Sequence, residues 1–141
     1  MIKTVKVFET GSVTADIILE NTPQNVVIGT EHADVGIVMP SFGGTVQGNH
    51  ELLLVPQNFA HKYNAAGVVT YGMSPQSMIT LSSVGEDRCV MTVQREITDI
   101  WGKTIEPQDI VISRMHLEPD AALATAAALL ITCAENDFWG I

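Results

Sequence analysis

The sequence predicts a single α/β domain over residues 1–141, with a small, mostly parallel sheet, an antiparallel hairpin extension and a buried C-terminal helix. Three observations predict this fold class. Short apolar runs separated by Gly, Pro and Asn fill the first half of the chain, as is typical of strands buried on both faces. Two further strand-like runs flank a short turn, which favours a hairpin. An Ala- and Leu-rich run near the C-terminus predicts a helix.

The first half of the chain is expected to supply the parallel strands. These strands are predicted over residues 2–8, 13–19, 26–30, 35–39, 51–55 and 68–71. Between the last two, residues 56–64 predict a short helix. Phe59, Ala60 and Tyr63 stand at helical spacing there, and Gly67 favours its end. A strand–helix–strand order predicts that the flanking strands are parallel neighbours.

The second half of the chain predicts antiparallel strands and one helix. Residues 77–84 and 88–94 form the expected hairpin, and residues 109–113 add a third strand after a turn at residues 101–103. A separate signal marks the helix. Pro119 suits a first helical turn, and residues 121–134 carry seven Ala and three Leu. Because this run is apolar nearly all round, we expect the helix to be buried on most faces.

Charge and cysteine content narrow the classes of function. The net charge is −9 with only seven Lys and Arg, so we expect no nucleic-acid binding and no docking on an anionic membrane. Residues 121–134 are too short for a bilayer span, and residues 1–6 lack the apolar stretch of a signal peptide. Cys89 and Cys133 stand in apolar contexts, which favours buried thiols in the cytoplasm.

The balance of apolar and charged residues bears on assembly. Hydrophobic residues make up 46% of the chain and charged residues 16%, which predicts a large packed core. So few charges also favour a homo-oligomer or a protein partner that covers apolar surface. A well-packed small monomer is the alternative interpretation.

Two short motifs resemble known sites. Residues 102–104, Gly-Lys-Thr, resemble the end of a phosphate-binding loop, but Ile97 stands where that loop needs glycine, so we interpret them as a tight turn. Residues 48–51, Gly-Asn-His-Glu, match a tetrapeptide of metallophosphatases, which makes Asn49 and His50 candidate ligand-binding residues. Two metals also need an upstream Asp-x-His, which the chain lacks, so a loop that leads into a strand is the favoured interpretation.

The main candidate site follows the expected strand over residues 26–30. Glu31, His32 and Asp34 are titratable and close in sequence, and ligands often bind beyond the carboxyl ends of parallel strands. His32 is the candidate ligand for a divalent metal. Gly43 and Gly44 would let a backbone approach a ligand closely, and they belong to the candidate functional loop over residues 40–49. An ordinary solvated loop is the competing interpretation.

The sequence also resembles a known family, over about residues 27 to 130. Residues 28–34 resemble the Asp-His motif of that family. Residues 53–58 occupy the place where the family has the end of an apolar strand. Residues 68–83 resemble a Thr-Tyr-Gly strand with its antiparallel neighbour, and His116 precedes the Ala-rich run as in a Gly-x-His-Asn motif. In this order the motifs resemble the central domain of the Mur ligases, which use ATP to build peptidoglycan precursors.

Differences from the sequence motifs of that family determine which activity we expect of this chain. Glu31 replaces the usual Asp, Leu117 replaces Asn, and the family's phosphate-binding loop is missing. The resemblance implies a role for His32 in supporting a second magnesium ion, but activation of ATP needs the missing loop. We therefore do not expect ligase activity from this chain.

Two hypotheses of function follow from the sequence. The first is a non-catalytic binding or interaction module of Mur-ligase-like descent, linked to cell-wall precursor metabolism, with no evident cofactor and with Phe138 and Trp139 as interface anchors. The alternative is a small-molecule or metal-dependent enzyme or sensor, with its site around Glu31, His32, Asp34 and the loop over residues 42–49.

Overall fold

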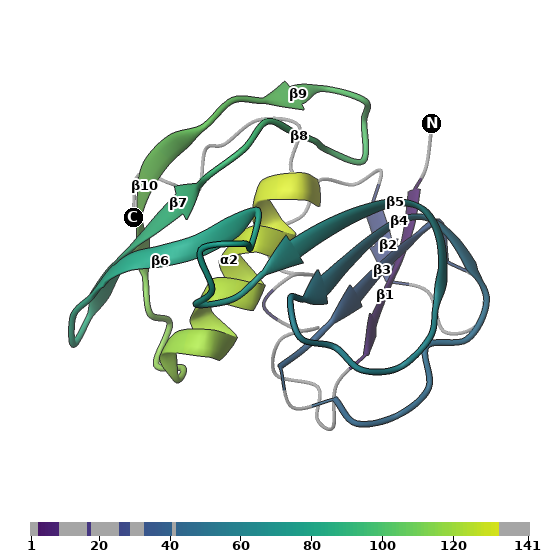
Figure 1. The fold of residues 1–141 in the computed structure, drawn as a ribbon, viewed down its shortest axis with the longest axis horizontal. Coiled ribbons are helices and arrows are strands. Elements are labelled where there is room, and N and C mark those ends of the chain that lie inside the picture. The colour runs from purple at the N-terminus through teal and green to yellow at the C-terminus, as the bar shows by residue number, and fades with distance from the viewer. Residues whose placement is uncertain (1–2, 9–16, 18–25, 29–32, 41, 133–141) are drawn as a thin grey trace.

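The computed structural model describes residues 3–8, 17, 26–28, 33–40 and 42–132 (Figure 1). Its main feature is an eight-stranded sheet with the strand order β10-β7-β6-β5-β4-β3-β1-β2. The strands are β1 (Lys3–Phe8), β2 (Val26–Ile28), β3 (Val35–Val38), β4 (Asn49–Pro56), β5 (Asn64–Tyr71), β6 (Ile79–Val84), β7 (Arg88–Val93) and β10 (Gln108–Ser113). Strands β1 to β6 run parallel to one another, and β7 is antiparallel to both β6 and β10. The mostly parallel α/β fold predicted from the sequence is therefore confirmed.

Two apolar layers cover the parallel strands. In β4, Leu54 belongs to the larger core with the helix, whereas Leu53 and Val55 belong to a second cluster that includes Phe42 and Phe59. Successive side chains in a strand point to opposite faces, so the two clusters lie on opposite faces of the sheet. All four residues of β3 are buried, which explains why its sequence is a continuous apolar run.

The connection from β4 to β5 differs from the prediction. The two strands are parallel neighbours as expected, but residues 57–63 contain a turn and extended chain, not the predicted helix. The strands are eight residues each and pair from Asn49↔Asn64 to Pro56↔Tyr71, so the connection must return along the full strand length. That length is about 23 Å at strand rise. Seven helical residues would span only about 11 Å, so only an extended chain can make the return.

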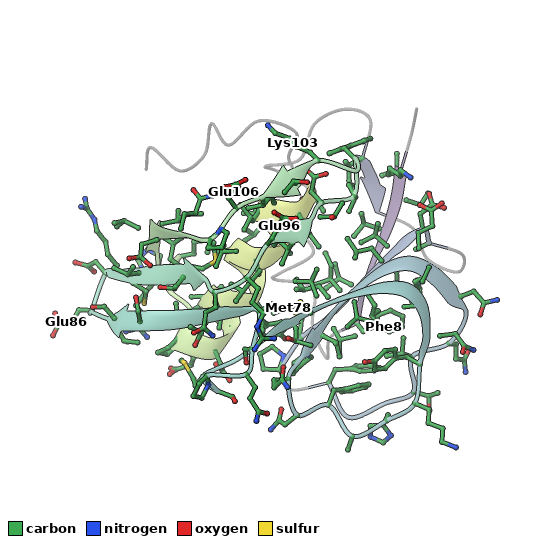
Figure 2. The ribbon with its side chains drawn as sticks, turned by 45° about the horizontal axis from the view of Figure 1, so that its top comes forward. Phe8, Met78, Glu86, Glu96, Lys103 and Glu106 are labelled. Carbon is green, nitrogen blue, oxygen red and sulfur yellow. The ribbon has the colours of Figure 1, made fainter. Side chains whose placement is uncertain are left out.

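The predicted antiparallel extension is confirmed. Strands β6 and β7 form the hairpin, with a bulge between Leu81 and Ser83, and β10 pairs along β7. Glu86 stands at the tip of this hairpin, far from Phe8 in the parallel half (Figure 2). A separate two-stranded unit joins β8 (Ile97–Thr98) to β9 (Thr104–Ile105).

The helix α2 (Pro119–Thr132) lies between the parallel strands and the antiparallel extension and packs on β5 and β6 (Figure 1). Eleven of its residues, Ala122 to Thr132, are buried, which confirms the predicted core helix as far as residue 132. Cys133 and Ala134 lie outside the described residues. Over the described part of the chain, no helix has both the length and the hydropathy needed to cross a membrane.

The turn at residues 100–102, which leads into β9, contacts the carboxyl end of α2. The Trp101 indole Nε1 donates to Thr132 O at 2.9 Å, and Ile100 N donates to Ile131 O at 3.0 Å. Asp99 Oδ1 shapes the turn by accepting from Trp101 N and Lys103 N at 2.9 and 2.8 Å. The Gly-Lys-Thr segment is thus the tight turn that the sequence favoured, and its neighbours satisfy carbonyl groups that a helix end leaves free.

Two further predictions concern segments that are mostly outside the described residues. Of the predicted strand over residues 13–19, only Ile17 is described, and its backbone is helical. The strand over residues 26–30 is confirmed for Val26–Ile28, and the residues after it are not described.

Candidate functional site

Asp34 is bonded within the sheet at its amino edge. Asp34 stands directly before β3, and its Oδ2 accepts from Thr4 N and Thr4 Oγ1, both at 3.2 Å. Thr4 Oγ1 in turn accepts from Asp34 N at 3.0 Å. This reciprocal pair ties β1 to β3, so the carboxylate has a structural partner. Glu31 and His32, which were predicted to share a site with Asp34, lie outside the described residues.

His50 is also bonded within the protein at the same edge. Its side chain is 5% exposed, and the ring stands edge-on to Phe8. Nδ1 lies 3.0 Å from Ala33 O, and Nε2 lies 3.2 Å from Gln47 O. A ring nitrogen that binds a metal needs a free lone pair, whereas a carbonyl oxygen calls for an N–H. Asn49 is the exposed first residue of β4, so the Gly-Asn-His-Glu segment leads into a strand, as the favoured interpretation held.

The glycine-rich loop before β4 is anchored by its apolar residues. Phe42 packs against Phe8, with ring centroids 5.5 Å apart, and Val46 is 4% exposed. A Cβ at Gly44 would stand 2.8 Å from Phe42 Cζ, so glycine there lets the ring fold over the backbone. Gly43 is exposed and has open space around it. The loop therefore covers the second apolar cluster.

A cavity of about 400 Å³ lies at the opposite, carboxyl edge of the parallel strands. Its walls are the residues that end or follow β3, β4 and β5, together with the first turn of α2; we call it the carboxyl-edge cleft. Pro40, Gln57, Gly72 and Asp120 represent these four segments in its lining. Strands β2-β1-β3-β4-β5 follow an order common in doubly wound α/β sheets, which bind ligands at this edge.

Two short segments build the floor of the cleft. Gln57 N donates to Tyr71 O at 2.8 Å, and Gly72 N donates to Ile79 O at 3.1 Å, so the ends of β4, β5 and β6 are held together. Gly72 has φ +152°, a conformation that other residues rarely adopt. A Cβ at this position would stand 3.2 Å from Ser77 Oγ and 3.6 Å from Gln57 Cβ. Glycine therefore permits the close approach of Gln57 and Ser77.

The buried polar groups beside the cleft are of two kinds. The Tyr71 hydroxyl donates to Val38 O at 2.5 Å. Burial, and secondarily the negative charge of Asp120, raise the pKa of Tyr71 well above its usual range, so this phenol stays neutral. By contrast, Gln57 Oε1 and Ser77 Oγ are buried and have no hydrogen-bond partner among the described residues. Unpaired buried polar atoms are rare in folded proteins and call for an explanation.

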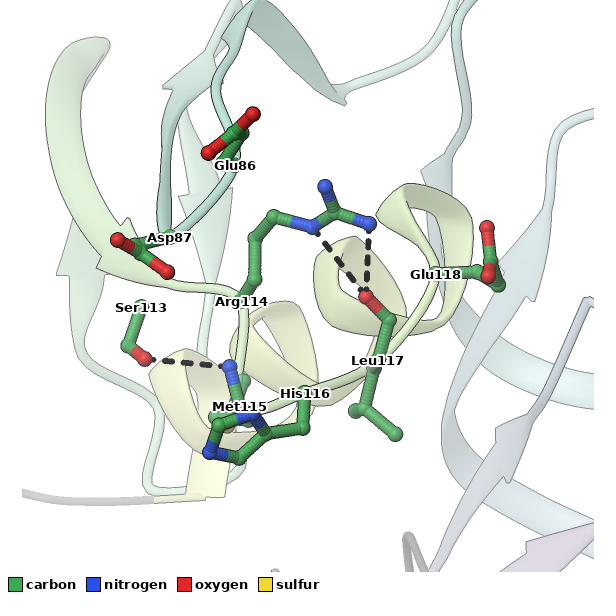
Figure 3. Close-up of a pocket in the computed structure, with 8 residues that line it drawn as sticks. All are labelled: Glu86, Asp87, Ser113, Arg114, Met115, His116, Leu117 and Glu118. Carbon is green, nitrogen blue, oxygen red and sulfur yellow. Dashed lines mark hydrogen bonds between the residues drawn. The ribbon is translucent and has the colours of Figure 1, made fainter.

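A second cavity, of about 320 Å³, lies between the hairpin tip and the start of α2 (Figure 3). Arg114 organises it by donating from Nε and Nη2 to Leu117 O, at 3.3 and 3.1 Å, and from Nη1 to Gly85 O. This bracing holds Met115 and His116 at positive φ, 55° and 58°. The Arg114 guanidinium therefore has backbone carbonyl groups as its partners. Within the described residues, no group of three or more His, Cys, Asp or Glu side chains could hold a metal ion.

The carboxyl-edge cleft was missed at the level of sequence. Gln57-Asn58 follow one predicted parallel strand and Gly72-Met73-Ser74 follow the next, so the carboxyl-edge rule could have pointed to them. That rule was applied only to the strand before Glu31.

Comparison with protein-family models, with curated proteins and with solved structures finds no match for this chain.

Proposed function

We propose that this domain is a non-catalytic binding module that holds a small molecule in the carboxyl-edge cleft. The observation that carries this proposal is the pair of unpartnered atoms, Gln57 Oε1 and Ser77 Oγ, beside a cavity of about 400 Å³. Leaving a buried donor or acceptor unpaired costs about 1–3 kcal/mol. Natural proteins accept such costs mainly at functional sites, where a ligand supplies the missing partner.

The shape and lining of the cleft support the same proposal. Its volume falls in the range of small-molecule sites, about 300–1,000 Å³. Apolar side chains such as Pro56, Met73 and Leu123 form part of the wall, and a few polar groups converge between them. Met73 is 55% exposed although it is large and apolar, so a ligand that contacted it would bury apolar surface that is exposed to solvent.

Descent, assembly and location belong to the proposal as well. The motifs described above support Mur-ligase-like descent and a link to cell-wall precursor metabolism. The low proportion of charged residues, 16%, supports a homo-oligomer or a protein partner, and the two apolar-context cysteines support a cytoplasmic location. Light scattering of the purified protein, with and without the residues after 132, would test the assembly.

A thermal-shift screen tests the binding proposal. The panel would include amines, alcohols, carboxylates, nucleotides and UDP-sugars, each with and without Mg²⁺ or Mn²⁺. A ligand at 100 times its Kd should stabilise the protein by roughly 2.7 kcal/mol. That is a shift of several degrees, because 1 kcal/mol corresponds to roughly 2–8 °C for domains near this size.

Two matched variants locate the bound ligand. Asn58 is an exposed residue of the cleft lining whose side chain has no hydrogen bond to the described residues, so Asn58→Trp should fill the cleft and abolish the shift. Asn64 is equally exposed but starts β5 at the amino edge, so Asn64→Trp should keep the shift. A shift that survives Asn58→Trp would contradict the proposal. If it also required metal and disappeared in His32→Ala, it would support the alternative enzyme or sensor.

A further inference from the structure

Building on the proposed function, we propose that the ligand of the carboxyl-edge cleft is a small primary amine with an apolar body. Its ammonium group would lie near Asp120 and donate a hydrogen bond to Gln57 Oε1, the unpartnered acceptor of a lining side chain. The inference combines the charge of the cleft, the hydrogen-bonding capacity of its free groups and the apolar character of its walls.

The charge of the cleft excludes an anionic ligand. Among the described residues that line the cleft, Asp120 is the one that carries a charge, and none is Lys, Arg or His. Asp120 and Tyr71 both line the cleft, and the charge of Asp120 contributes, after burial, to the raised pKa of that phenol. A phosphate or carboxylate would meet this negative charge without any basic partner, whereas an ammonium group would neutralise it.

The amino end of α2 does not provide an anion site either. Helix amino ends attract anions through their free N–H groups and their dipole. Here Asp120 already supplies a negative charge at that end, and its Oδ1 accepts from Ala121 N at 2.8 Å. Pro119 has no N–H, and Ala122 N donates to Glu118 O at 2.8 Å. The first turn is therefore largely satisfied by the protein.

The unpartnered groups call for a donor. Gln57 Oε1 can only accept, and it is buried without a partner. Ser77 is fully buried, its Oγ is unpartnered, and its N already donates to Ser74 O at 3.0 Å. Ser77 Oγ lies 3.2 Å from the point where a Cβ at Gly72 would stand, but of these two residues only Gly72 lines the cleft. The Tyr71 hydroxyl, which could have served as a donor to a ligand, is taken by Val38 O. An ammonium group carries three N–H donors, and one of them would satisfy Gln57 Oε1.

The remaining walls fit the body of such a ligand. Pro40, Pro56, Met73 and Leu123 line the cleft with the ring of Tyr71, and none of these side chains offers a charge. Burial of an apolar ligand body against these side chains would be favourable, because it removes apolar surface from water. A zwitterionic amino acid fits less well, because its carboxylate would also have to be buried beside Asp120.

Three matched probes test the inference on the protein of residues 1–141 at 150 mM salt: phenethylamine, 2-phenylethanol and 3-phenylpropanoate. They share an aromatic body and differ in the charge of the head group. We expect the Kd of phenethylamine, measured by protein-observed NMR, to be at least tenfold below that of either other probe. Asp120→Asn should raise the Kd of the amine about tenfold and leave that of the alcohol unchanged. Gln57→Leu, which removes the acceptor and keeps the approximate size of the side chain, should weaken the amine several-fold.

Glu118→Gln is the matched control, because it removes the same charge two residues away and outside the cleft lining. It should leave all three Kd values unchanged. Tighter binding of 3-phenylpropanoate, or an amine Kd unaffected by Asp120→Asn, would overturn the inference while leaving the binding proposal intact, provided that Asn58→Trp abolishes the binding. Amine binding that survives Asn58→Trp would be adsorption to an acidic surface and would overturn both proposals. So would the absence of binding by all three probes at millimolar concentration.

Discussion

The two edges of the parallel sheet differ in how their buried polar side chains are satisfied. At the amino edge, Asp34 is paired with Thr4, and His50 has a carbonyl oxygen at each ring nitrogen. At the carboxyl edge, Gln57 Oε1 and Ser77 Oγ are buried with no partner in the described part of the chain. Satisfied groups hold strands in register, whereas unsatisfied groups lower stability unless something binds them. This contrast is the reason for proposing a structural role for the polar side chains of the first edge and a binding role for those of the second.

The largest loss of stability is expected from a substitution at the amino edge of the sheet. His50→Ala should lower the free energy of unfolding by about 3 kcal/mol, because it removes a buried ring whose N–H donates to the Ala33 or the Gln47 carbonyl oxygen. Urea denaturation measures the loss. The control His61→Ala changes an exposed ring and should alter stability by less than about 0.5 kcal/mol. Equal effects of the two variants would show that the amino edge is not held by His50.

A smaller loss is expected at the floor of the cleft. Gly72→Ala should cost about 2 kcal/mol, because alanine is strained at φ +152° and its Cβ would crowd Ser77 Oγ. Gly43 has open space and no positive φ, so Gly43→Ala should be neutral or stabilise by up to about 1 kcal/mol. Thermal unfolding of both variants checks the difference, and a neutral Gly72→Ala would contradict the described geometry.

The Tyr71 hydroxyl has a hydrogen-bond partner, unlike the nearby Gln57 Oε1 and Ser77 Oγ. Tyr71→Phe should cost about 1 kcal/mol at neutral pH through loss of the bond to Val38 O. Because burial raises the pKa of folded Tyr71 above its unfolded value near 10, the folded state holds this proton more tightly. The resulting stability is fully present below about pH 10 and is lost above it, by up to about 1.4 kcal/mol per pH unit. Denaturation curves from pH 8 to 11 should show this slope in the wild type and a shallower one in Tyr71→Phe.

The smallest effect on stability is expected for a substitution of Ser77. This prediction is the most direct test of the difference between the satisfied polar groups at the amino edge and the unsatisfied ones at the carboxyl edge. Ser77→Ala removes an unpartnered buried hydroxyl, so the unliganded protein should be unchanged or more stable by up to about 1 kcal/mol. A clear destabilisation of the unliganded protein, measured by urea denaturation, would mean that Ser77 Oγ is already satisfied and would remove the main support for the binding site.

The sequence predicted most strands and the helix because their signals are local. Alternation and turn residues define β6 and β7, and the run of Ala and Leu after Pro119 defines α2. The helix predicted over residues 56–64 was wrong, since the spacing of Phe59 and Tyr63 instead serves an extended chain that packs on the second apolar cluster. Helical spacing alone could not reveal that β4 and β5 pair along their full length.

The candidate site depends on relations that the sequence does not display. Gln57 and Ser77 are far enough apart in the chain that only the pairing of β4, β5 and β6 brings both against Gly72. Whether a hydroxyl has a partner depends on every neighbour in space, so the contrast between Tyr71 and Ser77 is a property of the folded chain alone. Motif spacing, in contrast, pointed to Asp34 and His50, whose polar atoms are bonded within the protein.

Chemical-shift mapping of the ¹⁵N-labelled protein during titration with phenethylamine tests the central claim most directly. Binding at the carboxyl edge predicts saturable shifts of the backbone amides of Gln57, Gly72 and Ser77 and of the Gln57 side-chain amide, with little change at Asp34 and His50. Shifts confined to Asp34, Gly44 and His50, or the absence of saturable shifts, would contradict the assignment of binding to the carboxyl edge.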